Sequence, residues 1–490
     1  MNFKKGLAFL LASLMVFSLF AACNPNTTPE SSSGEESSLE ETASQNETSE
    51  TSKEETNESS SVSENSSKEE GTSAKPEGSS SKPEGSSVKP ENSSSKPENS
   101  SAKPENSSSK PEVSSQKPEI SSLVKPEEPI VPGNKAYFYD IWEKELAYLA
   151  SMQLDNGALP MTAAKNGNVT MNPYFADFAA LALLDAGKTY QAQVKKYIQW
   201  HMAHLNTAAT DYNGVDGTIY DYTLVVDDGV VIKENININD QGKKQYDSTD
   251  SYAATFLEVC NKYVKATGDS ALIKGYANEI SRIISAMGAT MDNDLTYAKP
   301  DYKVQYLMDN CEVYSGYLAA AELYETALSG VSGASAKAKE MRDTAKKVSD
   351  AIEDRMWNMV GKYYEPAVDR FGNSMYRFSW NNFYPSATAQ LFPICFGLLS
   401  PDSARAQQLY RDFNAAFSTG EDKKTWEQIS IPDAFFWGAI PHTAAMMGDK
   451  DRVTSYVTNY ERAMKKHAYP LYNADIARVA MACYVMASQL

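Results

Sequence analysis

The connections between successive helical segments alternate between long and short along most of this chain, and this alternation constrains the fold more than any other feature. Apolar residues recur at i, i+3, i+4 and i+7 in twelve segments between about Ala136 and Leu490, the spacing of a helix with one buried face. Connections after even-numbered segments are tight turns, whereas those after odd-numbered segments are longer. The pattern predicts six helical hairpins whose long loops share one end. The twelve predicted helices span residues 136–151, 173–186, 188–204, 248–267, 269–289, 308–328, 334–356, 383–399, 402–417, 432–447, 449–465 and 474–488.

The predicted fold is all-α, an (α/α)6 toroid of six helical hairpins over residues 135–490. Cys260, Cys311, Cys395 and Cys483 each fall in an even-numbered helix among apolar neighbours, and free cysteine packs as a small hydrophobe. We therefore expect these thiols to be buried and the even-numbered helices to form the inner ring. Function concentrates on loops that a rigid scaffold holds, so the end with the long loops is the expected functional end.

The N-terminus has the pattern of an export signal over residues 1–22. Lys4 and Lys5 precede an apolar run, too short to span a membrane, that ends in Ala21-Ala22-Cys23. The small residues before Cys23 resemble the bacterial lipobox. The resemblance implies that Cys23 becomes the lipidated N-terminus of an exported lipoprotein; a simple cleaved secretory peptide is the alternative.

Residues 23–134 are rich in Ser, Glu, Asn, Lys and Pro and hold few apolar residues, so they cannot bury enough surface to fold. Lys-Pro-Glu recurs every seven residues, but Pro and the lack of an apolar seam exclude a coiled coil. A linker of this composition is extended and semi-rigid. We expect a disordered stalk that displays the toroid on the extracellular face of the cell membrane, through a wall of the Gram-positive kind. The repeats begin at Lys75, Lys82, Lys89, Lys96, Lys103, Lys110 and Lys117.

Composition excludes several functional classes. The formal net charge is −18 and no basic cluster could neutralise phosphates, so nucleic acid is not an expected partner. The chain has no Cys-x-x-Cys or His-x-x-x-His spacing, no Gly-rich phosphate loop and no Gly-x-Ser-x-Gly motif. We expect neither metal nor cofactor, and a monomer that meets the membrane only through its N-terminal anchor.

Acidic and amide residues open the even-numbered helices, which places them together if these helices surround one axis. Such residues commonly cap helices, but capping needs one residue per helix. Asp247 with Asp250, and Asp309 with Glu312, are three residues apart and so project from one helix face. The other openings hold Asn172 with Asp177, Asn381 with Asn382, Pro432 with Asp433, and Asn473 with Asp475.

Such a set of carboxyl groups suits glycoside hydrolysis, which needs one carboxylic acid to protonate the leaving oxygen and one carboxylate to activate water or attack the sugar. Aromatic rings, which pack on the C–H faces of sugars, are concentrated in the long loops. The expected catalytic candidates are Glu312, Asp309, Asp433, Asp250 and Asp475, and the expected substrate-binding residues are Asp247, Tyr246, Trp380, Trp426, Tyr384, Tyr472 and Asn382.

Three motifs resemble the six-hairpin glycosidase superfamily, nearest to its glucoamylase-like members. They are residues 153–160 (Gln-Leu-Asp-Asn-Gly-Ala-Leu-Pro), residues 246–252 (Tyr-Asp-Ser-Thr-Asp-Ser-Tyr) and residues 308–314 (Met-Asp-Asn-Cys-Glu-Val-Tyr). In glucoamylase-like enzymes, the Glu of an Asp-x-x-Glu pattern at the start of the sixth helix is the general acid. The resemblance implies Glu312 as the acid, with Asp309 beside it.

The chain departs from that family at the catalytic base. The family takes its base from a Glu in the loop before the twelfth helix, but residues 465–474 hold no carboxylate and the first one is Asp475. Asp433, Asp475 and Asp250 are the remaining candidates for the base, with Glu427 a weaker one.

Two other functions fit the same toroid. A sugar epimerase or polysaccharide lyase would use a His or Tyr base, and His442 and His467 are the histidines expected near the long-loop end, with a core position favoured for His442. A catalytically inactive cell-surface glycan-binding lipoprotein would need only the aromatic residues. A hydrolase, in contrast, needs two carboxyl groups about 5 to 9.5 Å apart.

Overall fold

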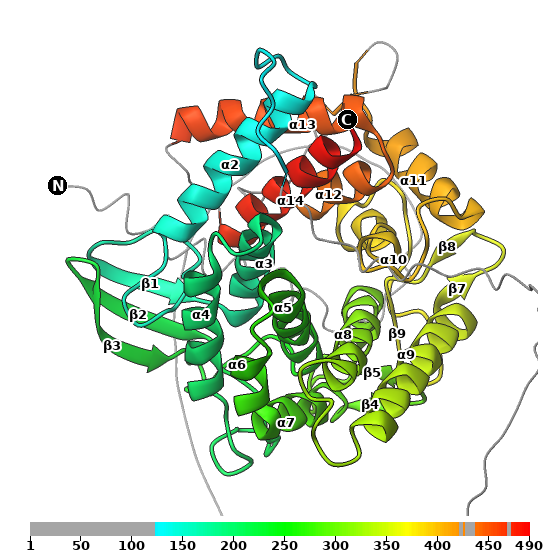
Figure 1. Cartoon of the computed structure of the whole chain (residues 1–490). Coiled ribbons are helices and arrows are strands. Elements are labelled where there is room, and N and C mark those ends of the chain that lie inside the picture. Colours follow the sequence, from blue (N-terminus) through cyan, green and yellow to red (C-terminus); the bar gives the residue numbers. More distant parts are fainter. Residues whose placement is uncertain (1–122, 421–424, 427–436, 468–471) are drawn as a thin grey trace, which may run out of the picture. The chain divides into compact units, whose positions relative to one another are not determined.

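The described residues form a ring of helices with a small antiparallel sheet at its edge (Figure 1). The computed structural model describes residues 123–420, 425–426, 437–467 and 472–490, and for residues 465–467 the backbone only. The described residues form one compact unit. Within the described residues, no helix has both the length and the apolar character that crossing a membrane requires.

Six helices form a closed inner ring, which confirms the all-α toroid. Each contacts the next in chain order, and the last returns to contact the first. Closure of this ring brings the first turns of all six helices around one axis. The inner helices are α3 (Pro173–Leu183), α5 (Asp250–Thr267), α8 (Leu307–Glu325), α10 (Phe392–Cys395), α12 (Ala439–Met446) and α14 (Asn473–Gln489).

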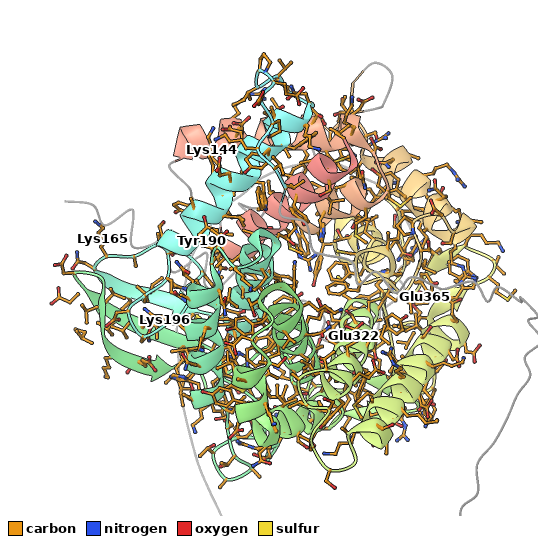
Figure 2. All side chains as sticks on the ribbon, viewed as in Figure 1. Lys144, Lys165, Tyr190, Lys196, Glu322 and Glu365 are labelled. Carbon is orange, nitrogen blue, oxygen red and sulfur yellow. The ribbon has the colours of Figure 1, made fainter. Side chains whose placement is uncertain are left out.

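The outer helices cover this ring and bury one face each. In α9, the side chains of Ala338, Met341, Ala345, Val348 and Ile352 are buried at alternating spacings of three and four, as expected for a helix with solvent on its other side. Charged side chains such as Lys144, Lys165 and Lys196 lie on the outside of the molecule (Figure 2). The outer helices are α2 (Lys135–Ser151), α4 (Gln191–Ala203), α6 (Ser270–Gly275) with α7 (Ala277–Met287), α9 (Ala334–Met356), α11 (Ala404–Phe417) and α13 (Lys450–His467).

Two predicted helices are broken in the structure. The segment predicted as 269–289 splits at Tyr276, directly after Gly275, into α6 and α7. The segment predicted as 383–399 becomes a single wide turn, η2 (Phe383–Ala387), followed by the short α10. Tyr384 has extended backbone angles (φ −128°, ψ 134°) because Pro385 disfavours the helical region for the residue before it. The helix predicted at 173–186 ends in a 3-10 turn, η1 (Leu184–Ala186). Of the helix predicted at 432–447, the structure describes the part from Trp437 onward.

The long loops contain strands that the helix-based analysis did not predict. Strands β1 (Gly167–Met171), β2 (Tyr222–Asp227) and β3 (Val230–Ile236) form an antiparallel sheet in that order. Asp228 and Gly229, both at positive φ, join β2 to β3 as a two-residue hairpin turn. The smaller antiparallel pairs are β4 (Met291–Asp292) with β5 (Leu295–Thr296), β6 (Gln305–Tyr306) with β9 (Ala367–Val368), and β7 (Trp357–Asn358) with β8 (Tyr363–Tyr364).

Three of the four cysteines predicted to be buried are buried. Cys260, Cys311 and Cys483 lie in the core, but Cys395 is partly exposed. Cys395 is the last residue of the short α10. The Cys395 Sγ accepts a hydrogen bond from the Arg478 guanidinium at 3.0 Å and lies 3.7 Å from Nδ1 of His442.

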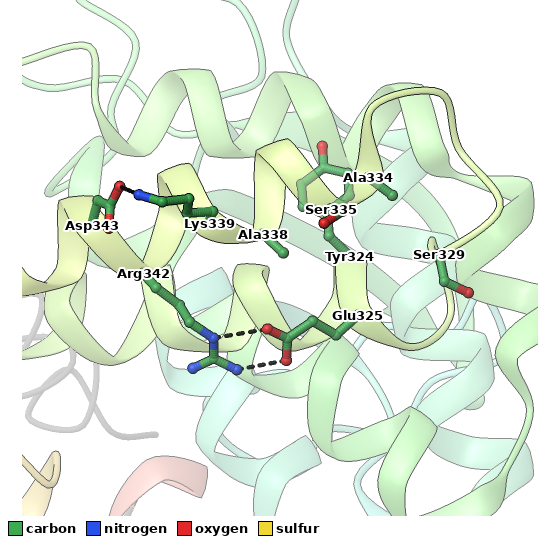
Figure 3. A pocket seen from close by; sticks show the side chains of 9 residues that line it. All are labelled: Tyr324, Glu325, Ser329, Ala334, Ser335, Ala338, Lys339, Arg342 and Asp343. Atoms are coloured by element: carbon green, nitrogen blue, oxygen red, sulfur yellow. Dashed lines mark hydrogen bonds and ion pairs between the residues drawn. The ribbon is translucent and has the colours of Figure 1, made fainter.

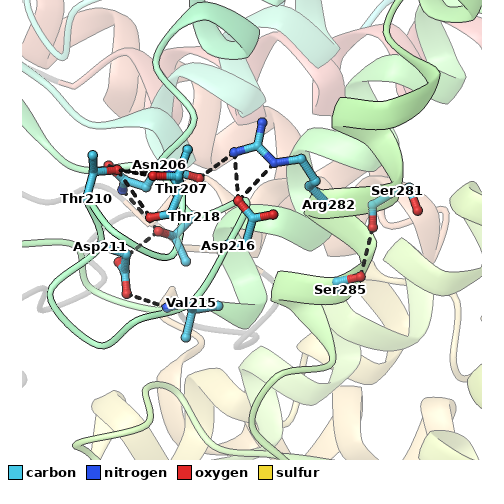
Figure 4. Close-up of polar contacts among 10 residues, drawn as sticks. All are labelled: Asn206, Thr207, Thr210, Asp211, Val215, Asp216, Thr218, Ser281, Arg282 and Ser285. Atoms are coloured by element: carbon cyan, nitrogen blue, oxygen red, sulfur yellow. Dashed lines mark hydrogen bonds and ion pairs between the residues drawn. The ribbon is translucent and has the colours of Figure 1, made fainter.

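Polar contacts pin the long loop between α4 and β2 to the outer layer (Figure 4). Arg282 of α7 donates to Asp216 Oδ1 at 2.9 Å and to the carbonyl of Asn206 at 2.6 Å. Asp211 accepts hydrogen bonds from the Thr218 hydroxyl at 2.8 Å and from the N–H of Val215 at 2.9 Å. This loop therefore has a defined path to β2, which it enters beside the inner ring.

Residues 123–134, which the sequence analysis placed in the stalk, contact the helical domain. The side chain of Leu123 packs against the hydrophobic core. Glu128 accepts a hydrogen bond from the N–H of Ala136 at 3.1 Å, and Asn134 caps α2 by accepting from the N–H of Tyr137 at 2.9 Å. The folded part therefore includes residues before the predicted boundary at 134. The signal segment, Cys23 and the stalk up to residue 122 lie outside the described residues.

Helices α5 and α8 approach so closely at Gly316 that no side chain fits there. A Cβ atom on Gly316 would lie 2.7 Å from both Cα and Cβ of Ala254 and 2.9 Å from the sulfur of Met287. Two of these atoms belong to the facing helix, so relief requires the helices to move apart. The packing of the inner ring depends on this glycine.

We predict that Gly316→Ala destabilises the protein by about 1–2 kcal/mol. Overpacking costs roughly 1–3 kcal/mol, and contacts of 2.7 Å with the facing helix place this site in the upper half of that range. The higher helix propensity of Ala offsets about 1 kcal/mol of the cost. Urea unfolding measures the change. Gly275→Ala is the control, because its Cβ meets no atom within 4 Å; it should be neutral or stabilising. Equal stability of the two variants would show that the ring absorbs the extra methyl group.

Candidate active site

The first turns of the inner helices meet at one end of the ring. Tyr174 of α3 donates a hydrogen bond to Glu312 of α8 at 2.5 Å. The ring of Phe175 lies 5.8 Å from the ring of Tyr472, the residue before α14, and Asp475 of α14 accepts from the N–H of Gly438, before α12, at 2.9 Å. The predicted convergence of helix starts is therefore present.

Glu312, the predicted acid, is almost fully buried, with 1% of its surface exposed. Burial raises its pKa to about 8, against the lowering effects of the Tyr174 hydrogen bond and of the positive charge on Arg478. A carboxyl group with this pKa carries its proton at neutral pH, which is the state that a general acid needs.

Two further carboxyl groups, those of Asp250 and Asp309, belong to the same cluster, because the charges of Asp250 and Glu312 both act on Asp309. Asp250 is fully buried and accepts hydrogen bonds from the Thr296 hydroxyl at 2.6 Å and from the N–H of Ser251 at 2.9 Å; burial raises its pKa to about 7. Asp309 is partly exposed, and its pKa is raised well above the usual range by burial, and then by the charges of Asp250 and Glu312. Like charges this close do not all ionise together.

Asp247 and Asp221 extend the acidic cluster toward the sheet. The pKa of Asp247 is raised by burial and lowered by Lys299, with a net increase. Asp221 is buried, accepts hydrogen bonds from Asn172 at 3.1 Å and from the Tyr252 hydroxyl at 3.0 Å, and has its pKa raised to about 8 by burial. Asp221 opens β2 rather than a helix, so a search of helix starts could not find it.

Tyr174 and Arg478 are two more residues that the sequence analysis missed. Arg478 is buried one turn into α14, with its guanidinium 3.9 Å above the ring of Phe178. Its charge acts on Glu312. Asn172-Pro173 is a recognisable helix start, so the position of Tyr174 in the first turn of α3 could have been predicted; the role of Arg478 required the fold.

Two predicted substrate-binding aromatics are core residues instead. Trp426 has 1% of its surface exposed and packs edge-on against Tyr410, Phe413 and Tyr456, between α11 and α13. Tyr246 has 2% exposed and lies in a stack with other tyrosines of the long loop. Both predictions were wrong because an aromatic side chain in a loop can fold back onto the domain. The spacing of aromatic residues in the sequence does not show in which direction each side chain points.

The other predicted residues have varied positions. Asp475 is 3% exposed and accepts from the backbone of Gly438, where a Cβ would lie 2.7 Å from Cβ of Arg478. This carboxyl therefore joins α14 to the start of α12, and its catalytic role stays a prediction. Tyr472 and Tyr384 are partly exposed near the starts of inner helices, and the Tyr384 ring lies 4.8 Å from the ring of Trp437. Trp380 is partly buried, and its ring meets the ring of Phe378 edge-on. Asn382 is exposed. The side chains of Asp433, Glu427 and His467 lie outside the described residues.

A surface hollow of about 510 Å³ lies elsewhere, where α8 ends and α9 begins (Figure 3). Its charged side chains pair with one another: Arg342 donates twice to Glu325, at 2.8 and 2.6 Å, and Lys339 pairs with Asp343. It contains none of the predicted catalytic carboxyls. Nowhere in the described part of the chain do three or more His, Cys, Asp or Glu side chains form a group that could hold a metal ion.

Comparison with known proteins finds similarity among solved structures, and these include three glycoside hydrolases. No protein-family model matches the chain, and no curated protein matches it. A wild-type glycosidase aligns with a TM-score of 0.47 and 11% identity, covering 72% of this chain and 97% of its own. An alpha-amylase from Clostridium perfringens aligns with a TM-score of 0.46 and 9% identity, and the alignment covers 71% of this chain and 97% of the amylase. A rhamnosidase from Klebsiella oxytoca with rhamnose bound aligns with a TM-score of 0.44 and 11% identity, and the alignment covers 71% of this chain and 64% of the rhamnosidase.

We predict that Glu312→Gln stabilises the protein at alkaline pH relative to the wild type. Because the folded-state pKa of Glu312 lies above its unfolded value, its contribution to stability is full below the unfolded pKa and is lost as the pH rises through about 8. Glutamine has no proton to lose. The difference in unfolding free energy, variant minus wild type, should therefore grow by on the order of 2–4 kcal/mol between about pH 5 and about pH 9, as urea unfolding measures. Glu322→Gln on the same helix is the control, and parallel behaviour of the two variants would refute the prediction.

Proposed function

We propose that this protein is a glycoside hydrolase that acts on an extracellular oligo- or polysaccharide by carboxylate acid/base catalysis. The observation that carries the proposal is the contact between a buried Glu312 and Tyr174, in one cluster with Asp250 and Asp309. One group can then donate a proton at neutral pH while a neighbour holds negative charge. Glycosidic bond cleavage requires this division of roles between two carboxyl groups.

In this mechanism, Glu312 protonates the glycosidic oxygen as the bond to the anomeric carbon breaks. The Asp250–Asp309 pair supplies the carboxylate. Asp309 is the member that reaches solvent, so it is the one placed to activate water or attack the sugar. Because the charge of Asp250 raises the pKa of Asp309, Asp309 can act as a carboxylate only in the state in which Asp250, held in place by Thr296 and Ser251, carries the proton. Asp433 stays a candidate for the base from the sequence.

Partly exposed aromatic rings at the same helix starts are suited to sugar binding. Phe175 packs against Tyr472, and Tyr384 against Trp437. Apolar ring faces of this kind bury the C–H faces of a sugar while hydroxyl groups at their edges can bind its polar groups. The carbohydrate is thus the proposed partner, and the export signal, Cys23 and the stalk place the enzyme on the outer face of the membrane in this proposal.

Proton abstraction by an epimerase or lyase is less well supported by the geometry. His442 is buried, and its pKa is lowered to about 3 by burial and by the positive charges of Arg478 and Lys262. The pKa of Tyr174 is raised well above its usual value by burial and by Glu312. Deprotonating Tyr174 near neutral pH is therefore costly, which makes it a poor general base there.

We predict that a glycan panel reveals hydrolysis by the wild type and that Glu312→Gln lowers turnover by about three orders of magnitude on substrates with poor leaving groups. Loss of the transferable proton is the reason, since glutamine keeps the shape. Reducing-end release measures turnover, and Glu322→Gln is the control with unchanged rates. Equal glycan affinity of wild type and Glu312→Gln without hydrolysis by either would establish a binding module instead.

A further inference from the structure

The Tyr174 hydroxyl makes a defined hydrogen bond to one of the two oxygens of Glu312. It donates to Oε1 at 2.5 Å, short for a bond between a hydroxyl and a carboxyl group. Oε2 is left as the other position for a proton. The bond therefore distinguishes the two oxygens of the group that the proposed function assigns as the acid.

The ring of Tyr174 is fixed on two sides. It stacks on Tyr252, with ring centres 5.9 Å apart and planes inclined by 16°, and meets Phe178 edge-on at 4.9 Å. Asn172 holds the turn that carries it, by accepting from the N–H of Phe175 at 2.9 Å and donating to the Tyr252 hydroxyl at 2.7 Å. The hydroxyl is thus preorganised and needs little reorganisation to bind Glu312.

Other ionisable groups act on Glu312 from four of the inner helices, α3, α5, α8 and α14. Burial raises the pKa of Glu312 most, and Glu258 raises it further, whereas the Tyr174 bond and Arg478 lower it. Removing the Tyr174 hydroxyl takes away the larger of two uncharged side-chain interactions that lower the pKa of Glu312, the other being with Ser251, and it neither adds nor deletes a charge. The groups coupled to Glu312 are Asp177 on α3, Glu258 on α5, Asp309 and Cys311 on α8, and Arg478 on α14.

We propose that Tyr174 is the positioning residue of the acid, holding Oε1 of Glu312 so that Oε2 carries and delivers the proton. This inference rests on the proposed function. As the glycosidic bond breaks, Oε2 loses its proton to the leaving oxygen, and the bonding electrons go to that oxygen. Glu312 becomes a carboxylate, and its bond from Tyr174 becomes charge-assisted and roughly twice as strong. Tyr174 thereby stabilises charge that develops in the transition state.

Tyr174→Phe tests this role through the pH profile and the leaving group. The Tyr174 bond favours the ionised form of Glu312, so its loss raises the pKa of Glu312 and moves the alkaline limb of kcat/KM upward by about one pH unit. Turnover should fall about 10- to 100-fold on poor leaving groups and much less on activated aryl glycosides, which need little protonation. Tyr276→Phe, on the outer layer, is the matched control and should change neither.

Two outcomes would assign Tyr174 to packing alone and overturn the inference. One is an alkaline limb of kcat/KM that does not move in Tyr174→Phe. The other is an equal loss of turnover on both substrate types together with a lower Tm. A carbon-13 NMR titration of the Glu312 carboxyl, assigned by comparison with Glu312→Gln, gives a readout without turnover. An unchanged titration midpoint in Tyr174→Phe overturns the inference while leaving the proposed function intact. Absence of hydrolysis on every glycan instead overturns the proposed function, and the catalytic role of Tyr174 with it.

Discussion

Closure of the inner ring is the constraint on which the rest of this structure depends. The last helix, α14, packs against both α3 and α12, so residues far apart in the chain share one axis. The ring is tight enough that glycine is required where α5 meets α8 at Gly316 and where α12 meets α14 at Gly438. Because the inner helices run with their first turns at one end, closure also brings together the side chains that open them. The site is a consequence of how the ring packs.

The same closure forces carboxyl groups together at a cost in stability. Burial raises the pKa of Asp250, Asp309 and Glu312, and the charges of Asp250 and Glu312 raise that of Asp309 further. A structure selected only for stability would place apolar or amide residues there. Retention of ionisable groups under such strain is typical of catalytic sites. Tyr174 and Arg478 moderate the cost by acting on the ionised form of Glu312, so the surroundings of the acid tune its proton affinity as well as its position.

Features that depend on neighbouring residues within one helix could be predicted from the sequence, whereas breaks and strands in the loops were missed. Helix α9 was predicted at 334–356 and spans these residues, because its apolar stripe is a local property of one helix. The segment after Phe383 was predicted as one helix but breaks at Tyr384-Pro385, a proline signal that the apolar spacing concealed. Strands β2 and β3 were missed although Tyr222, Leu224 and Val226 alternate in burial and Asp228-Gly229 marks a hairpin. The strand alternation in these loops is short, and the longer helical periodicity of the chain concealed it.

The sequence by itself determined the number and order of the hairpins, the inner position of the even-numbered helices, and the pairing of Asp309 with Glu312 one turn apart. These follow from periodicities of a few residues. Only the tertiary structure decided which side chains share the site: it brought Tyr174, Asp221 and Arg478 to the carboxyls, and placed Trp426 and Tyr246 in the core. The physical reason is that burial and charge depend on neighbours from other helices, whose directions no local pattern encodes.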